Sequence, residues 1–197
     1  MDFTMVKENL EQAGYLVSCF ETAKEAAAFL NQQIDGVTVG FGGSMTLEEM
    51  GLYELLAPHN QVFSHWKNPG PETLAKAQTA KVYLSSVNGL AQTGQIVNID
   101  GSCNRISSIV YGHEQVYFVV GSNKIAPDYE SALFRARNVA APKNARRLKR
   151  QTPCAIGPEK CHDCKSPERI CKALSVLWQK PYAVACHVIL IDESLGY

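Results

Sequence analysis

Four of the seven cysteines lie in one stretch of 18 residues, CAIGPEKCHDCKSPERIC, from Cys154 to Cys171. The spacing is C-x6-C-x2-C-x6-C, and its central pair, Cys161 and Cys164, matches the two-ligand knuckle of zinc and iron-sulfur sites. Cys154 and Cys171 complete a set of four thiolates, whose negative charge the neighbouring basic side chains offset. The spacing therefore predicts a metal site and leaves zinc and an iron-sulfur cluster both open. The alternatives are reduced free thiols or a disulfide.

A glycine-rich segment, GFGGSMT, joins a predicted strand to a predicted helix. Glycines let the backbone approach a ligand closely, and hydroxyl groups at a helix start suit a phosphate or carboxylate. The segment lacks the lysine of a P-loop and the third glycine of a dinucleotide fingerprint, so it carries no flavin or nicotinamide signature. The alternative is a tight turn with an ordinary helix cap. The candidate ligand-binding residues here are Gly42, Gly43, Ser44 and Thr46.

Two further loops combine charged and amide side chains directly after buried strands. Asp100, Asn104 and Arg105 follow the strand QIVNI, and an arginine is well suited to hold a carboxylate or phosphate. Asn123 and Lys124 follow the strand QVYFVVG. Both loops favour an anionic ligand.

Basic residues continue along the chain after this second loop. Arg135 and Arg137 are two positions apart on a predicted helix and so face different sides, which leaves at most one of them for a shared ligand. The run KNARRLKR, residues 143–150, holds five positive charges in eight positions and is interpreted as a solvated face.

Composition limits the classes of protein that the chain can represent. Its 197 residues suit one domain with an appendage, and 19 Lys and Arg residues balance 19 Asp and Glu residues. This balance argues against nucleic acid and membranes as partners. The N-terminal residues MDFTMVKENL do not resemble a signal peptide, and the longest apolar runs are too short for a membrane helix. We therefore expect a cytoplasmic protein.

Helical and strand-like segments alternate along the whole chain. Capping boxes at Thr22 and Thr46 open two helices, and Asp128 caps a third helix, which Pro142 is expected to end. A last helix is predicted near residues 168–179, before a final strand. The alternation with seven candidate strands predicts an α/β fold: a mostly parallel sheet covered on both faces, with ligands at the carboxyl ends of the strands.

The motifs, taken in order, resemble the LUD family, the lactate-utilisation domain of LutC/YkgG-like proteins. The resemblance rests on VGFGGSMTLEEMG, TGQIVNIDGSCNR, VYFVVGSNKIAPDYESALFRAR, APKNARRL and HVILIDESLGY, and the four-cysteine segment is similar to that of the short members. It implies a single domain over residues 1–197 with a Cys-rich insertion at about 150–172. It also implies a Rossmann-like sheet of the sugar-phosphate isomerase and CoA transferase type (NagB/RpiA/CoA transferase-like). One departure is His113, where the family pattern leads us to expect a proline.

The resemblance also implies site residues. Its pattern maps onto Gly40, Gly42, Ser44, Thr46, Thr93, Gly94, Asp100, Gly101, Asn104, Arg105, Asn123, Lys124, Asp128, Arg135, Arg137, Asn144 and Arg147. The ligand-binding residues predicted from all these observations are Gly42, Gly43, Ser44, Thr46, Thr93, Gly94, Gly101, Asn104, Arg105, Asn123, Lys124 and Arg135. Since related isomerases and transferases use a carboxylate as base or nucleophile, Asp100 is the candidate catalytic residue.

The family is associated with the oxidation of lactate to pyruvate, alongside iron-sulfur partner proteins. The resemblance thus implies a protein that binds a small anionic metabolite as a component of lactate or organic-acid utilisation. A homodimer is compatible with this function. Two alternatives stay open at this point: a stand-alone transferase or isomerase acting on a CoA ester or sugar phosphate with a structural zinc, and a regulatory binding module without turnover.

Overall fold

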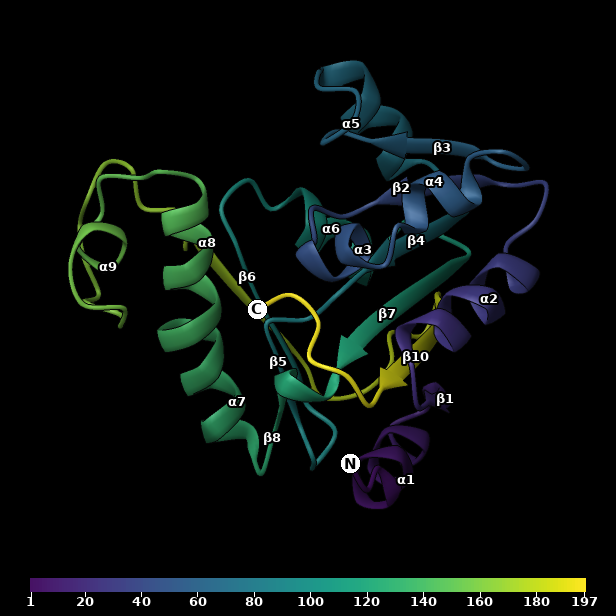
Figure 1. The fold of residues 1–197 in the computed structure, drawn as a ribbon, viewed down its shortest axis with the longest axis horizontal. Coiled ribbons are helices and arrows are strands. Elements are labelled where there is room, and N and C mark those ends of the chain that lie inside the picture. Colours follow the sequence, from purple (N-terminus) through teal and green to yellow (C-terminus); the bar gives the residue numbers. More distant parts are fainter.

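The computed structural model describes residues 1–197, and its centre is a six-stranded sheet in which all strands run parallel (Figure 1). The strand order is β1-β10-β7-β4-β2-β3. The strands are β1 Leu16–Phe20, β2 Thr38–Phe41, β3 Gln61–Ser64, β4 Val82–Ser85, β7 Gln115–Gly121 and β10 Ala185–Ile191. The predicted α/β fold with a mostly parallel sheet is confirmed.

Helices cover both faces of this sheet. They are α1 Thr4–Gln12, α2 Ala23–Gln33, α3 Met45–Glu49, α4 Leu52–Leu56, α5 Pro71–Gln78 and α6 Asn104–Val110. Side chains of a strand alternate between faces, so Phe118 of β7 packs in one core cluster with Leu10 of α1, and Val119 packs in another with Leu30 of α2. Burial on both faces explains the continuous apolar sequence of β7. None of the helices is long and apolar enough to cross a membrane.

A second, smaller sheet lies beside the first, with the strand order β8-β5-β6-β9. Its strands are β5 Gly89–Ala91, β6 Ile96–Asp100, β8 Ile125–Ala126 and β9 Ala173–Leu177. The remaining helical segments are η1 Ser122–Lys124, α7 Tyr129–Arg135, η2 Ala136–Ala140, α8 Ala141–Arg147 and α9 Pro153–Ile156. The strand predicted at QIVNI therefore forms but belongs to the second sheet, because its short connection to β5 makes an antiparallel pair.

The helix predicted from Thr46 to Leu56 is in fact two short helices. Gly51 has a φ of +61°, a left-handed conformation that interrupts the helix between α3 and α4. The N-cap of α3 is Ser44, whose Oγ accepts a hydrogen bond from the backbone N–H of Leu47 at 3.4 Å. The predicted cap at Thr46 is wrong, and its hydroxyl is buried inside the protein.

The helix that begins after Asp128 continues through Pro142. Asp128 caps it as predicted, since its Oδ1 accepts from the N–H of Ser131 at 2.7 Å. The five residues Ala136–Ala140 form a π-helical turn, and Pro142 then lies in the first turn of α8. The prediction that Pro142 ends the helix is wrong because the π-helical turn before it changes the hydrogen-bond pattern and places Pro142 in the first turn of α8, where proline is tolerated.

The predicted helix over residues 168–179 is also wrong. Residues Ala173–Leu177 form β9, which pairs antiparallel with β6 so that Val97 lies opposite Val176. Pairing with a strand far away in sequence thus outweighs the local helical pattern, as strand formation depends on its neighbours.

The close packing of α5 on β2 predicts that Gly40 cannot be enlarged. A Cβ atom at Gly40 would lie 2.3 Å from the carbonyl oxygen of Ala77. We expect Gly40→Ala to lower the free energy of unfolding by about 1–3 kcal/mol, measured by urea denaturation, because α5 must move off the sheet. Gly36→Ala is the control, since a Cβ there meets nothing within 4 Å and costs only the strain of its φ of +65°. An equal loss in both variants would contradict this tight contact.

Candidate functional site

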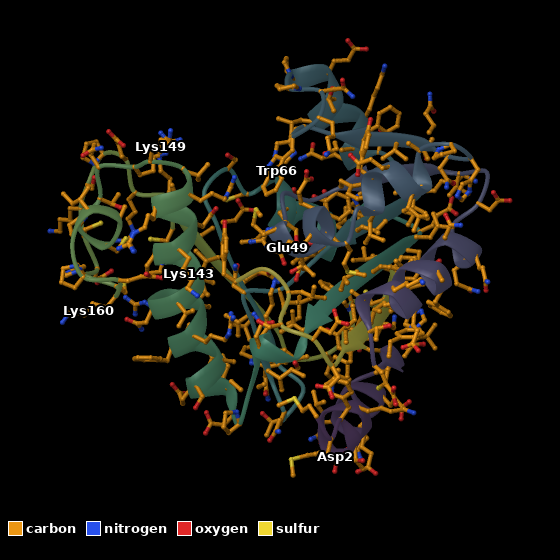
Figure 2. All side chains as sticks on the ribbon, in the orientation of Figure 1. Asp2, Glu49, Trp66, Lys143, Lys149 and Lys160 are labelled. Atoms are coloured by element: carbon orange, nitrogen blue, oxygen red, sulfur yellow. The ribbon has the colours of Figure 1, made fainter.

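A cavity of about 390 Å³ lies at the carboxyl ends of the parallel strands. Loops after β2, β3, β4 and β7 form one side, and the loop after β6 together with α8 forms the other (Figure 1). Figure 2 shows Trp66 on the side of the main sheet and Lys143 on α8 across from it. The polar and charged lining residues are Ser44, His65, Ser86, Asn88, Asp100, Ser102, Asn104, Arg105, Lys124, Asn144, Arg147, Arg150 and Tyr197.

Lys124 is a buried cation in the wall of this cavity, with only 3% of its surface exposed. Its Nζ donates hydrogen bonds to Thr46 Oγ1 at 2.6 Å and to Ser86 Oγ at 2.9 Å. Burial, together with the charges of Arg135 and Arg105, lowers the pKa of Lys124 to about 7. The ammonium group is therefore only partly charged at neutral pH, and a bound anion would raise its pKa.

The guanidinium group of Arg105 is fixed by neutral acceptors. Nη1 donates to Asn98 Oδ1 at 2.8 Å and to the carbonyl of Ser86 at 3.3 Å. Nη2 donates to Asn88 Oδ1 at 3.0 Å and to the carbonyl of Ile99 at 2.7 Å. Burial lowers the pKa of Arg105. The structure thus holds a positive charge beside the cavity without a direct carboxylate partner.

Asp100 is engaged by the backbone at the start of α6. Its Oδ1 accepts from the N–H groups of Gly101 at 2.7 Å and Ser102 at 3.2 Å, and its Oδ2 accepts from those of Arg105 and Ile106, both at 3.1 Å. The carboxylate therefore orients the helix that carries Arg105. Its role as a base or nucleophile stays a prediction, and that chemistry would compete with these four hydrogen bonds.

Arg147 enters the site from α8 and packs on an aromatic ring. Its guanidinium carbon lies 4.6 Å from the ring centroid of Trp66, and its Nε donates to Tyr197 Oη at 2.7 Å. Gly43 leaves room for this arrangement, since a Cβ there would lie 2.8 Å from Trp66 Nε1. The last residues of the chain are held nearby, because the N–H of Gly196 donates to Glu49 Oε2 at 2.6 Å.

Sequence reasoning missed part of this group. The basic residues of the run 143–150 are exposed, so its interpretation as a solvated face is confirmed, but two of them, Arg147 and Arg150, also line the cavity. Asn144 and Arg147 came only from the family pattern. Trp66 and Tyr197 were missed entirely, and the one available signal was the position of Trp66 just after the strand QVFSH.

The structure brings together about half of the predicted ligand-binding residues. Those that line the cavity are Gly43, Ser44, Gly101, Asn104, Arg105 and Lys124. Gly42 and Thr46 do not line it. Gly42 directly precedes Gly43, and Thr46 Oγ1 accepts a hydrogen bond from the cavity residue Lys124.

Two other predicted residues brace the site from outside the cavity. Arg135 donates from Nε to the carbonyl of Asn123 at 2.8 Å and from Nη1 to the carbonyl of Asn88 at 2.5 Å. Burial lowers the pKa of Arg135 to about 10. Asn123 in turn holds the end of the chain, since its Oδ1 accepts from the N–H of Leu195 at 3.1 Å. Both residues position the loops that carry the lining residues.

Thr93 and Gly94 do not belong to the cavity. They form the turn between β5 and β6, and the nearest atoms to a Cβ at Gly94 would be those of Asn9 in α1. His113, the departure from the family pattern, is buried, stacks on Tyr83 with a centroid distance of 4.8 Å and pairs through Nδ1 with the carbonyl of Ala80. Its position indicates a packing role.

All four clustered cysteines line a second, smaller cavity across α8. Arg137 lines it as well, whereas Arg135 reaches the loops of the main sheet, so the prediction that these arginines face different sides is confirmed. The cysteines are free thiols. No group of three or more His, Cys, Asp or Glu side chains already has the arrangement of a metal site.

The fold and the cavity define an α/β domain with a cavity at the carboxyl edge of a parallel sheet. The model of the LUD domain matches residues 3–191, so the chain belongs to the LUD domain family, which is associated with lactate utilisation. None of the curated proteins compared matches the chain. The fold is similar to the crystal structure of a DUF162 family protein from Deinococcus radiodurans at 1.70 Å resolution, with a TM-score of 0.56 and 12% identity over 97% of this chain and 99% of that chain. At this identity the likeness shows the fold alone.

The hydrogen bonds of Asp100 predict a structural cost for its removal. Asp100→Ala leaves four backbone N–H groups without their acceptor, and we expect a loss of about 1–2 kcal/mol in the free energy of unfolding, measured by urea denaturation. Asp128→Ala is the comparison, because the Asp128 side chain caps α7 at an exposed position through the N–H of Ser131. If Asp100→Ala costs no more than Asp128→Ala, the proposed anchoring of α6 is wrong.

Proposed function

We propose that the cavity at the carboxyl ends of the parallel strands binds a small anionic metabolite. In this proposal the chain takes part in the utilisation of lactate or a related organic acid. One observation carries this proposal. Four cationic side chains line the cavity and none of them pairs with a carboxylate: Arg105, Lys124, Arg147 and Arg150. The only acidic residue in the lining is Asp100, whose carboxylate oxygens already accept hydrogen bonds from backbone N–H groups.

Unpaired cations in a partly desolvated cavity favour an anion as ligand. Burying a charge is costly, and the neutral acceptors of Lys124 and Arg105 offset only part of this cost, so an anion would compensate the remaining charge. Arg147 and Arg150 are more exposed and add to the positive potential that attracts an anion to the opening. The charges thus divide between residues that hold the ligand and residues that guide it.

The volume of the cavity favours a small ligand. Ligand sites in proteins span about 300–1,000 Å³, and 390 Å³ lies near the lower limit. A hydroxy acid, an oxo acid or a compact phosphate suits this volume better than a CoA ester does. No contact specifically favours the alternatives of a transferase, an isomerase or a regulatory module, and the occupied oxygens of Asp100 count against a catalytic carboxylate.

In this proposal, iron-sulfur partner proteins carry the electrons when lactate is oxidised to pyruvate, while this chain holds the acid. The parallel sheet with a ligand cavity at the strand ends also supports our placement of the fold in the NagB/RpiA/CoA transferase-like group.

The first test of the proposal removes the charge at the opening. Arg147→Gln should raise the Kd for lactate, pyruvate or inorganic phosphate up to about fivefold in isothermal titration calorimetry at low ionic strength, since one exposed charge contributes up to about 1 kcal/mol. Lactamide, the neutral analogue of lactate, should not bind. The matched control is Lys143→Gln, which removes a positive charge from an exposed position of α8 outside the cavity. Equal affinities in both variants, or binding of lactamide as tight as that of lactate, would refute the proposal.

The second test follows the protonation of Lys124. Anion binding favours the protonated amine, so its pKa is about 7 in the free protein and higher in the complex. Affinity should be full below this value and fall by up to about tenfold per pH unit as the pH rises above it, with proton uptake visible in buffers of different ionisation enthalpy. Lys124→Met should bind more weakly and without this pH dependence. An unchanged pH profile in Lys124→Met would rule out Lys124 as the titrating group.

A further inference from the structure

The second cavity gathers all four cysteines of the segment between α8 and β9. Cys154 comes from α9, and Cys161, Cys164 and Cys171 come from the irregular chain that follows. Figure 1 shows this segment on the side of α8 that faces away from the main sheet. Each of the four residues is partly buried, while Cys19 and Cys103 elsewhere in the chain are exposed. The fold thus gathers four of the seven thiols in one place.

Hydrogen-bond donors surround the sulfur atom of Cys161. Asp163, between the two central cysteines, has a φ of +44°, which turns the chain tightly, and its N–H donates to Cys161 Sγ at 3.4 Å. Arg137 Nη2 lies 3.6 Å from the same sulfur, and the N–H of Cys161 donates to Asn138 Oδ1 at 3.1 Å. N–H donors and a positive charge beside a sulfur atom are the surroundings that metal-bound cysteines have in proteins.

Arg169 fixes the other cysteines relative to this turn. Its Nε donates to the carbonyl of Cys171 and its Nη1 to the carbonyl of Cys164, both at 2.8 Å, while Nη2 reaches Asp163 Oδ1 at 3.2 Å. One guanidinium group therefore connects three parts of the segment. Together, Arg137 and Arg169 also supply positive charge beside four potential thiolates.

We propose that Cys154, Cys161, Cys164 and Cys171 bind a single zinc ion as four thiolates. Zinc favours tetrahedral sites with Zn–S distances of about 2.3 Å, so the free thiols must rotate inward and release their protons on binding. The small space between the cysteines, about 20 Å³, favours one ion over the eight-atom core of a four-iron cluster.

The zinc site would also stabilise the wall of the cavity in which we propose that the anion binds, and this consequence rests on the proposed function. Ala141 of α8 and Ile170 line both cavities. The N–H of Lys172 donates to the carbonyl of Asp100 at 2.9 Å, and the carbonyl of Ile170 would lie 2.8 Å from a Cβ at Gly101. The backbone on both sides of Cys171 therefore packs on the Asp100 loop, and fixing Cys171 fixes one wall of the anion site.

The test is metal analysis of the full chain after anaerobic, reducing purification without an affinity tag that binds metals. We expect one zinc per chain, and after replacement by Co²⁺ the visible spectrum of a tetrahedral thiolate site. Cys164→Ser should lose most of the bound zinc, whereas the control Cys19→Ser should retain it. Bound iron with acid-labile sulfide, or substoichiometric zinc that reconstitution with excess Zn²⁺ does not restore, would overturn the proposal.

A second measurement covers the case in which Cys164→Ser fails to fold. Titration of the metal-free wild-type chain with Zn²⁺ against a chromogenic chelator should give a one-to-one complex and a higher melting temperature, and no complex would overturn the site. Removal of zinc should weaken anion binding several-fold. Unchanged anion affinity would overturn only the stabilising role, and an absence of anion binding in the zinc-loaded protein would refute the proposed function while the zinc site stands.

Discussion

The buried ammonium group of Lys124 is the constraint on which the site depends. Its two hydroxyl partners come from different segments, Thr46 in α3 after β2 and Ser86 directly after β4, while Lys124 itself follows β7. These segments meet only because β2, β4 and β7 are neighbours in a parallel sheet and end at the same edge. A shift of one residue in this pairing would turn core side chains outward, so the apolar register that stabilises the fold also places the charge.

The same dependence explains which parts could be predicted from the sequence. Strand β7 is a continuous apolar run, and a residue shortly after such a run lies at a strand end, which is why the sequence could place Lys124 beside the cavity. The α/β architecture follows from the alternation of such runs with helices. Local sequence patterns thus predict those features that depend only on burial and on the position of a residue along one helix or strand.

Other features depend on partners far away in sequence. Strand β9 forms because β6 offers an edge, and Arg147 meets Trp66 across 81 residues of chain, a contact that no local pattern encodes. Thr93 and Gly94 show a different limit of the sequence. The family motif predicted that they bind the ligand, but their turn lies outside the cavity and packs against α1. The spacing of the cysteines predicted their gathering in one place, but not that this place shares a wall with the cavity at the strand ends.

Helix α8 connects the two cavities, and its continuation through Pro142 makes this possible. Asn144 and Arg147 face the cavity at the strand ends, Pro142 and Ala145 face the cysteines, and Ala141 lines both cavities. Residues three or four apart share a helix face, so a helix ended at Pro142 would present neither pair. The π-helical turn just before it, of a kind often found at functional sites, keeps the chain helical and sets the rotation of α8. A change in the cysteine segment would therefore be transmitted along α8 to Arg147 and to the cavity that it lines.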